Sequence, residues 1–510
     1  MAAGRTEFEL KLELGEDDIA TIAGSAPLAE MTNGAACRRR LRSTYFDTAE
    51  RTLERAGVSL RIRETEAGRV QTVKVGTEVA GGVSNPIEDE TPTTRTRPHP
   101  GAIGDEKLRG RLVDLVDFTA LRPVFRTDID RVTHRLVGPG VEAELSFDTG
   151  RLVAGRRSEP ISEVELELLS GDIDAFCELV LRLFGDVPIR LSTRSKAGRG
   201  YDLIAGGAAR PGPARAATPP LRADDEVAGA FAAVCAAAAT QILDNWSRLA
   251  CDKDPEIAHQ LRIGLRRLRT ALRVFRPAID SPTLRDMRRD LAEVGRIVGN
   301  LRNADVMLGD IVRPALGDPA SRDAADRVVA LLARHCGGER ERVAATLAGP
   351  RWNRLALRVA LLPHGAGWST AAAGGEVGRL AAIALGSCWK KVCRRGRKLE
   401  RLDDAGRHQL RKDLKTLRYA AEFFAPMLPA GKCGRFLRRL KTLQDGFGYL
   451  NDVVLAGTLP GMLPDDLRAD PAVQRTVGFV LGWHRALAER EWASARERWR
   501  RLARQQLPWT

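Results

Sequence analysis

Five segments within the first two hundred residues alternate strictly between apolar and charged side chains. The first is EFELKLEL (7–14), in which Glu7, Glu9 and Lys11 alternate with a phenylalanine and leucines. Alternation with a period of two predicts a β-strand with one apolar and one charged face. The other four segments are VSLRIRE (58–64), RVQTVKV (69–75), GVEAELSFD (140–148) and ISEVELELL (161–169).

Two architectures accommodate such strands. An open sheet would pack its apolar face on helices and leave the charged face in water. A closed barrel would instead line its lumen with the charges, under a coat of helices. Buried charges cost several kcal/mol each unless they are compensated. Hard divalent cations compensate carboxylates and phosphate compensates arginine, so a lumen that mixes both kinds of charge suits a metal–polyphosphate complex.

The periodicity changes after a stretch rich in Ala, Gly and Pro at 205–226, which we interpret as a linker. From 227 onward, long segments with a period of 3.6 residues predict an all-α bundle. We therefore expect an α+β chain with a strand domain at 1–204 and a helical domain at 227–505. The apolar run at 227–239 is too short to span a bilayer and predicts a buried helix.

The helical half contains an internal repeat. HQLRIGLRRLR (259–269) and HQLRKDLKTLR (408–418) agree at seven of eleven positions, with an offset of 149 residues. The same offset relates VGNLRN (298–303) to FGYLND (447–452). A constant offset across separate blocks predicts two copies of one helical unit, related by a pseudo-two-fold axis.

The net charge of +15 is concentrated in this helical half. Residues 1–223 contain 32 Lys and Arg against 34 Asp and Glu, which leaves 49 basic and 32 acidic residues for 224–510. Such asymmetry indicates a polyanionic partner, namely nucleic acid, an anionic membrane or inorganic polyphosphate. Eight scattered cysteines without a CxxC pair favour reduced thiols in a cytoplasmic protein.

Each copy of the repeat places a basic stripe beside an apolar stripe on one helix. Like charges stacked at helical spacing repel one another by a few tenths of a kcal/mol per pair, so a bare stripe suggests a bound anion. A zinc site is not expected, because no further His or Cys shares helical spacing with either histidine. The stripes consist of His259, Arg262, Arg266 and Arg269 in the first copy and His408, Arg411, Lys415 and Arg418 in the second.

The order of charged residues in the first domain resembles the CYTH family, the triphosphate tunnel metalloenzymes. Its ExExK signature is matched by Glu7, Glu9 and Lys11. The resemblance implies that eight antiparallel strands form a tunnel in which basic residues grip a triphosphate and acidic residues hold Mg²⁺ or Mn²⁺. The later matches are Arg61-x-Arg63, Lys74, a basic residue near Arg126, Asp148, the pair Glu163 and Glu165, and Lys196.

The resemblance also implies roles for these residues. Around 122–131 the sequence departs from the family, because Arg126 is followed by Asp128 instead of a second basic residue; Arg122 or Arg131 could supply that contact. The implied catalytic set is Lys11, Glu7, Glu9 and Glu165, the metal ligands are Glu7, Glu9, Asp148, Glu163 and Glu165, and the phosphate-binding residues are Lys11, Arg61, Arg63, Lys74, Arg122, Arg126 and Lys196.

The helical half resembles the CHAD family, a helical domain named for its histidines, through both histidine helices and LKTLQDGFGYLND (440–452). That resemblance implies binding of inorganic polyphosphate along the basic stripes. We therefore expect a metal-dependent enzyme that hydrolyses inorganic triphosphate to diphosphate and phosphate, with polyphosphate held by the second domain. In the cytoplasm, such a protein could associate with polyphosphate granules.

Two alternatives remain at this point. The chain could be a non-catalytic protein that only binds or is targeted to polyphosphate, or a tunnel enzyme that acts on thiamine triphosphate or ATP. Nucleic acid is not expected as a partner, because aromatic residues make up only 5% of the chain and base stacking needs them. No membrane association is expected, and the oligomeric state is left open.

Overall fold

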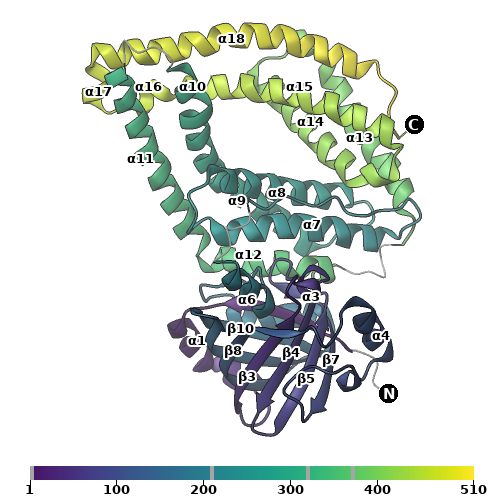
Figure 1. Cartoon of the computed structure of the whole chain (residues 1–510). Helices are drawn as coiled ribbons and strands as arrows, with labels where there is room; N and C mark the ends of the chain where they lie inside the picture. The colour runs from purple at the N-terminus through teal and green to yellow at the C-terminus, as the bar shows by residue number, and fades with distance from the viewer. Residues whose placement is uncertain (1–4, 207–211, 317–321, 369–373, 510) are drawn as a thin grey trace. The chain divides into compact units, whose positions relative to one another are not determined.

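The computed structural model describes residues 5–206, 212–316, 322–368 and 374–509 (Figure 1). The chain divides into two compact units. The first contains residues 1–214 and 348–366, and the second contains 215–347 and 367–510. Of the predicted linker at 205–226, residues 207–211 lie outside the described part of the chain.

One antiparallel sheet forms the centre of the first unit. Among the described residues it has eight strands of six residues or more and three strands of two residues. The long strands are β2 (Phe8–Glu13), β3 (Cys37–Asp47), β4 (Val58–Thr65), β5 (Gly68–Val75), β7 (Ile87–Thr93), β8 (Arg122–Gly138), β9 (Val141–Ala154) and β10 (Arg157–Gly171), and the short ones are β1 (Arg5–Thr6), β6 (Val83–Ser84) and β11 (Arg190–Leu191).

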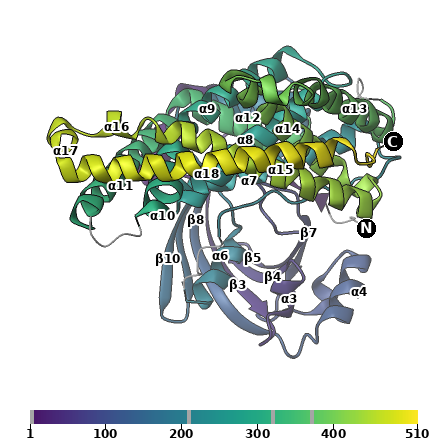
Figure 2. The same ribbon diagram turned by 90° about the horizontal axis from the view of Figure 1, so that it is seen from above.

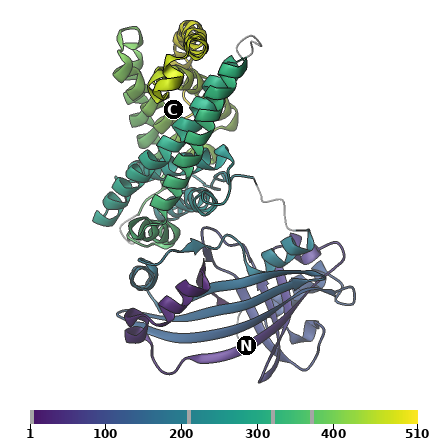
Figure 3. The same ribbon diagram turned by 90° about the vertical axis from the view of Figure 1, so that its left-hand side faces the viewer.

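The sheet curls until its ends meet. The strand order is β1-β7-β5-β4-β3-β8-β9-β10-β2-β11, with β6 also paired to β2. Only Glu7 separates β1 from β2 in the chain, so β7 at one end and β10 at the other flank what is nearly one continuous strand. Figures 2 and 3 show the long strands side by side in this curved wall. The predicted eight-stranded antiparallel tunnel is confirmed.

The period-two pattern explains which face of the wall is apolar. On β4 and β5 the apolar residues Leu60, Ile62 and Val73 pack in one core cluster with Leu108 and Leu112 of helix α4 (Glu106–Leu115). The charged residues between them therefore point the other way, into the tunnel. The other helices that flank the sheet are α1 (Glu16–Ala23), α2 (Ala26–Met31), α3 (Thr52–Arg55), α5 (Ile173–Phe184) and α6 (Lys196–Ile204).

The first unit also includes a helix from the second half of the sequence. Helix α12 (Pro350–Leu361) packs on α5. Its Asn353 donates a hydrogen bond from Nδ2 to the carbonyl of Val187 at 2.7 Å, and Arg354 pairs with Asp186 at 2.8 Å. This helix lies within the helical domain predicted at 227–505, and the predicted boundaries do not assign it to the first domain at 1–204. Helical periodicity identifies the apolar face of a helix but not the surface that covers this face.

The second unit is helical throughout its described residues. Its helices are α7 (Val227–Arg248), α8 (Pro255–Val274), α9 (Pro282–Val306), α10 (Arg313–Ala315), α11 (Arg322–Leu347), α13 (Val377–Gly396), α14 (Asp404–Phe424), α15 (Ala430–Ala456), α16 (Leu459–Met462), α17 (Asp465–Ala469) and α18 (Pro471–Ala503), with a π-helical turn at Met307–Val312.

The predicted repeat corresponds to the order of these helices. In the first copy α7, α8 and α9 pack in sequence, and α13, α14 and α15 do so in the second. The starts of the two copies exchange backbone hydrogen bonds reciprocally, from Val227 N to Gly375 O at 3.0 Å and from Val377 N to Asp225 O at 2.9 Å. This reciprocity is what a pseudo-two-fold axis requires, and the same symmetry packs α8 against α14.

Helix α7 is the one helix in the described residues long and apolar enough to cross a membrane. In its most apolar stretch 61% of the residues are buried, and Phe231, Val234 and Ile242 are almost fully covered. The buried helix predicted at 227–239 is confirmed, and it forms part of the core of the second unit.

Candidate active site

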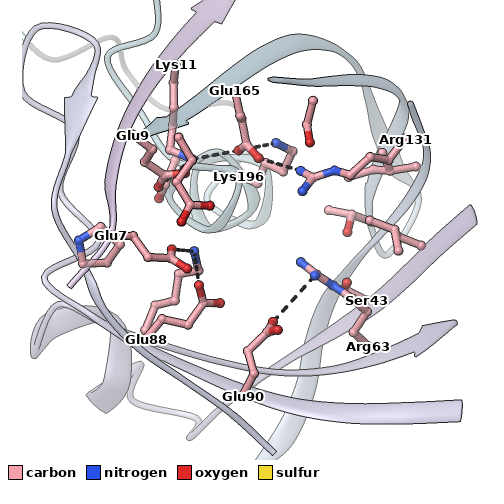
Figure 4. A pocket seen from close by; sticks show the side chains of 18 of the residues that line it. Glu7, Glu9, Lys11, Ser43, Arg63, Glu88, Glu90, Arg131, Glu165 and Lys196 are labelled. Carbon is pink, nitrogen blue, oxygen red and sulfur yellow. Dashed lines mark hydrogen bonds and ion pairs between the residues drawn. The ribbon is translucent and has the colours of Figure 1, made fainter. Parts of the chain in front are cut away.

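The charged faces of the strands line one cavity of about 450 Å³ in the first unit (Figure 4). Glu9, Arg63 and Glu165 reach into it from β2, β4 and β10. Its lining is close to charge balance, with seven carboxylates and eight basic side chains. These are Glu7, Glu9, Glu88, Glu90, Glu144, Glu165, Glu167 and Lys11, Arg39, Arg61, Arg63, Lys74, Arg131, Arg135, Lys196.

Lys11 lies between two carboxylates on neighbouring strands. Lys11 and Glu165 are directly opposite each other in the β2–β10 ladder, and Lys11 Nζ is 2.7 Å from Glu165 Oε1 and 2.9 Å from Glu9 Oε1. Burial alone would lower the pKa of Lys11, but Glu165 and Glu9 outweigh it and raise that pKa above the ordinary value. Lys11 is therefore a permanent cation in the wall of the cavity.

Lys196 connects three carboxylates at one end of the same cluster. Its Nζ lies 2.7 Å from Glu163 Oε2, 2.8 Å from Glu165 Oε1 and 2.9 Å from Asp148 Oδ2. Burial opposes the charge of Lys196, but Asp148 and Glu163 raise its pKa well above the ordinary value. Burial likewise works against ionised Glu165, yet Lys11 and Lys196 hold its pKa well below the usual range.

Helix α6 carries Lys196 and is anchored at two points. The Ser195 side chain caps its first turn by accepting a hydrogen bond from Gly198 N at 3.2 Å. Further along, Tyr201 donates a hydrogen bond from its hydroxyl to Asp47 at 2.8 Å, where both groups are buried. Gly200 allows the helix to approach closely, since a Cβ there would lie 2.3 Å from the Phe125 ring.

Arg131 is the cavity-facing arginine of β8. It pairs with Asp148 at 2.6 Å and with Glu165 at 2.5 Å. Arg126 and Arg122 are exposed and do not line the cavity, because on β8 the inward positions are those of Thr127, Ile129 and Arg131. The expected positions of Arg122 and Arg126 in the tunnel are therefore corrected: strand parity places Arg131 on the inner face and these two outside it.

A second charged cluster lies around Lys74. Lys74 Nζ is 2.8 Å from Glu88 Oε2 and 2.9 Å from Glu7 Oε2. Burial raises the pKa of Glu88, and the neighbouring Glu7 carboxyl raises it further. Sequence reasoning missed Glu88 and Glu90, although Glu88-x-Glu90 repeats the spacing of the opening strand. The segment IEDETPT (87–93) has few apolar residues between its charges, so it lacks the alternating pattern that predicts a strand.

Two arginines in the cavity keep unsatisfied donors. The Nε groups of Arg61 and Arg63 are buried and lack a hydrogen-bond acceptor. Glu90 is 3.6 Å from Arg63, which is too long for a hydrogen bond. Burial lowers the pKa of Arg63 to about 10, and the positive charges of Arg61 and Arg131 contribute. Buried N–H groups of this kind favour an anion with several acceptor oxygens.

The predicted metal ligands divide between the cavity and its wall. Glu7, Glu9 and Glu165 line the cavity, whereas Asp148 and Glu163 are almost fully buried behind it. No group of three or more metal-binding side chains is gathered for coordination within the described residues.

The donor chemistry nevertheless fits a divalent cation. The carboxyl groups of Glu7 and Glu88 lie on either side of Lys74 Nζ, at 2.9 and 2.8 Å, and both line the cavity. Such neighbouring carboxylate oxygens are the donors that a hard divalent cation prefers. Glu9, one pleat away on the same strand, is held by a hydrogen bond from Ser84 Oγ at 2.7 Å.

The second unit contains a separate basic cavity of about 570 Å³, formed by α8, α9 and α14. Six of the eight predicted stripe residues line it, whereas His259 and Arg418 do not. Arg418 is instead paired with Glu422 at 3.1 Å. The basic residues that line this cavity, which we call the basic pocket, are Arg262, Arg266, Arg269, Arg273, Arg288, Arg296, His408, Arg411, Lys412 and Lys415.

Within the described residues, no carboxylate forms an ion pair with Arg262, Arg411 or Lys415. Glu422 is engaged by Arg267 at 2.5 Å, and the Asp413 carboxylate that borders the pocket pairs with Arg395. The Nε groups of Arg269 and Arg411 are buried without an acceptor. The positive charge of this pocket is therefore largely uncompensated. Burial and the charges of the neighbouring arginines accordingly lower the pKa of Lys415 to about 5.

Comparison with known proteins finds the same two families that the sequence motifs resemble. Residues 5–201 match the CYTH domain and residues 233–459 match the CHAD domain. An inorganic triphosphatase from Haemophilus influenzae is 33% identical over 171 residues, which are 32% of this chain and 46% of that relative. The chain thus spans about half the length of the curated relative that it matches.

Solved structures support the assignment of the helical half. The CHAD domain from the plant Ricinus communis is 25% identical, covers 58% of this chain and 99% of its own length, and has a TM-score of 0.50. PptA from Streptomyces chartreusis is 21% identical and covers 55% of this chain and 100% of its own length, with a TM-score of 0.42. The chain therefore carries a CYTH domain followed by a CHAD domain.

Proposed function

We propose that the tunnel hydrolyses inorganic triphosphate to diphosphate and phosphate with the help of Mg²⁺ or Mn²⁺. The observation that carries this proposal is the pair of buried, unsatisfied donors on Arg61 and Arg63, in a cavity whose three lysines and Arg131 are already paired with carboxylates. A ligand that brings both a cation and phosphate oxygens satisfies the carboxylates and these donors together.

Phosphoryl transfer depends mainly on positioning and charge neutralisation. Lys11, Lys196 and Arg131 exchange part of their carboxylate contacts for phosphate oxygens. Glu165 is a weak base because its pKa is well below the usual range, and its role is to hold these three cations in place. A metal held by Glu7, Glu9 and Glu88 would neutralise phosphate charge and orient the attacking water.

The cavity lining favours an inorganic substrate over ATP or thiamine triphosphate. Tyr45 is the one aromatic side chain among the described residues that line it. That ring is stacked on Phe125 at 4.4 Å between centroids, and its hydroxyl accepts a hydrogen bond from Arg61 at 3.3 Å. Because Tyr45 is buried, with only 3% of its surface exposed, its ring offers little surface on which a purine or thiazole could stack. Its hydroxyl and the guanidinium group suit phosphate.

For the basic pocket we propose binding of long-chain inorganic polyphosphate. The uncompensated arginines on α8 and α14 support a polyanion, and the described residues that line the pocket include no Phe, Tyr or Trp on which a nucleobase could stack. Association of the protein with polyphosphate granules in the cytoplasm would follow from this binding.

The enzymatic proposal is tested by phosphate release from tripolyphosphate with and without Mg²⁺ or Mn²⁺. Glu7→Ala and Lys11→Ala should each lower turnover by about 10²–10³-fold, the loss typical of removing one group that stabilises transition-state charge. Arg126→Ala on the outer face of β8 is the matched control and should keep full activity. Full activity of both tunnel variants, or binding of tripolyphosphate without hydrolysis, would favour the non-catalytic alternative.

The binding proposal needs a separate measurement. The double variant with Arg262→Ala and Arg411→Ala should lose affinity for long-chain polyphosphate and retain turnover of tripolyphosphate. Duplex DNA at equal phosphate concentration serves as the competitor. If DNA displaced polyphosphate efficiently, the basic pocket would be a general polyanion site and the proposed partner would be wrong.

A further inference from the structure

Lys415 occupies an unusual position for a lysine. It lies on α14 in the wall of the basic pocket, half-buried, with arginines of α8 and α14 as its main charged neighbours. The Asp452 carboxylate of α15 also acts on it but forms no ion pair with it among the described residues. The tunnel lysines, in contrast, each contact two or three carboxylates. Lys415 has no carboxylate ion pair among the described residues and is surrounded by groups that attract phosphate. Its amine can therefore act as a nucleophile, whereas the tunnel lysines are ion-paired ammonium groups.

We propose that Lys415 is a nucleophilic lysine that is acylated by small acyl phosphates, and that polyphosphate in the basic pocket protects it. The inference rests on the proposed anion binding by this pocket and adds a modification site to it. The reagent class is defined by the two halves of the site, because the arginines recognise phosphate and the amine attacks an electrophilic acyl carbon.

The arginines supply the docking half of the site. Arg269 and Arg411 retain buried Nε donors without an acceptor, and Arg262 lines the same cavity. A phosphate group held by these donors places the acyl carbon, which is joined to one of its oxygens, within the cavity that Lys415 borders. Docking of this kind converts an encounter between amine and reagent into a reaction between neighbours.

The protonation state of Lys415 supplies the reactive half. Burial and the charges of Arg266 and Arg411 lower its pKa to about 5, so the amine is neutral at pH 7 and has a free electron pair. An ordinary lysine with a pKa of about 10.4 has only about one neutral amine in 10³ at that pH. A bound acyl phosphate carries at most two negative charges, too few to offset the eight other Arg and Lys side chains that line the pocket.

The reaction balances without a further reagent. The electron pair of Lys415 Nζ forms a bond to the acyl carbon, and the bond from that carbon to the phosphate oxygen breaks. Phosphate leaves with the bonding electrons and remains near the arginines, while the nitrogen gives up a proton to the phosphate or to water. The products are an amide on Lys415 and inorganic phosphate.

Polyphosphate has the opposite effect on this amine. It carries about one negative charge per phosphate unit, so a chain across the pocket offsets many of the arginines and favours protonation of Lys415. It also fills the space that the acyl phosphate would occupy. Conversely, acylation removes one potential positive charge from the pocket and should weaken polyphosphate binding.

The experiment treats the full chain with acetyl phosphate at pH 7 and measures acetylation of each lysine by mass spectrometry of peptides. Lys412 is an internal control, because it lines the same pocket one turn away but is exposed. Lys415 should be acetylated at least tenfold faster than Lys412. Long-chain polyphosphate should slow acetylation of Lys415 at least tenfold, and Arg411→Ala should reduce the preference for Lys415.

Polyphosphate binding is measured on the same samples, so that the two proposals can fail separately. Equal acetylation rates at Lys415 and Lys412 with normal polyphosphate binding would overturn the modification site and leave the proposed function intact. Polyphosphate that binds without slowing acetylation of Lys415 would overturn the protection. Selective acetylation of Lys415 in a protein that binds no polyphosphate would support the nucleophile and overturn the proposed partner.

Discussion

The tunnel and the basic pocket both gather cations in sheltered positions, but they compensate them differently. In the tunnel Lys11, Lys74 and Arg131 each contact at least two carboxylates at 2.9 Å or less. In the basic pocket, Arg262 and Lys415 have no such partner among the described residues. The difference indicates the net charge of each ligand: a cation together with an anion for the tunnel, and an anion alone for the pocket.

The comparison also predicts how each site behaves when it is empty. Buried ion pairs satisfy one another, so the tunnel can fold around its own charges without a ligand. Uncompensated arginines repel one another, so the empty pocket subtracts from the stability of the helical unit. Removing one charge should therefore have opposite effects in the two places.

The largest effect is expected for Asp148→Ala, which leaves Arg131 and Lys196 buried with fewer acceptors. Loss of one partner from a buried pair typically costs about 3–5 kcal/mol of stability. Calorimetry should show this loss in the transition of the first unit, whereas Arg262→Ala should leave the second transition unchanged or slightly raised. Asp130→Ala, on the exposed face of β8, is the control, and an equal loss there would contradict the argument.

Ionic strength should separate the two sites next. Binding of a polyanion to exposed cations releases counterions, and with about six phosphates contacted the affinity should fall about 10²–10³-fold between 50 and 200 mM salt. The buried tunnel is screened less. Titrations of long-chain polyphosphate and the KM for tripolyphosphate, measured across the same salt series, test this. A parallel decline in both would mean that the tunnel binds its ligand through unpaired charge as well.

A smaller effect is expected from pH. Because Lys415 has a pKa of about 5 in the empty pocket and a bound polyanion raises it, binding takes up a proton above pH 5. Affinity for polyphosphate should then fall by about tenfold between pH 6 and pH 8. The groups that act on this amine are His259, Arg262 and Arg266 of α8, His408, Arg411 and Arg418 of α14, and Asp452 of α15.

The variant Lys415→Met serves as the control for this pH effect. It should bind polyphosphate with little pH dependence over that range, apart from titration of the histidines. A slope that survives unchanged in the variant would assign the proton to another group. In the tunnel, Lys11 and Lys196 have raised pKa values, so they stay charged throughout this range and contribute no comparable slope.

The sequence predicts which face of a strand each side chain occupies more reliably than it predicts which strands pair with one another. Period two is a property of the backbone, so Glu9, Arg63 and Glu165 could be assigned to one charged face from local pattern alone. Closure of the sheet depends on pairings distant in sequence, such as that between Glu163 and Glu13, and only the resemblance to a known family indicated it.

The errors arose where local pattern was weak. The family motif favours Arg126 over Arg131 by its spacing alone. Spacing does not show which residues of β8 point into the tunnel, and a shift of one residue along a strand moves a side chain to the other face of the sheet. Glu88 and Glu90 lie on a strand with few apolar residues. Helix α12 is attached to the first unit by contacts of Asn353 with Val187 and of Arg354 with Asp186. Sequence periodicity does not predict such contacts between distant residues.

The smallest predicted effect separates paired from unpaired arginines on a single helix. Arg411→Ala removes a guanidinium group that lines the basic pocket and has no ion pair among the described residues, and affinity for polyphosphate should fall about tenfold, as for loss of one charge-assisted hydrogen bond. Arg418→Ala, two turns later, removes a group outside the pocket that is paired with Glu422, and affinity should change by less than about twofold. Glu422 keeps its contact with Arg267, so Arg418→Ala leaves no unpaired carboxylate behind. Equal losses in the two variants would show that total charge on α14, not compensation of individual side chains, controls binding.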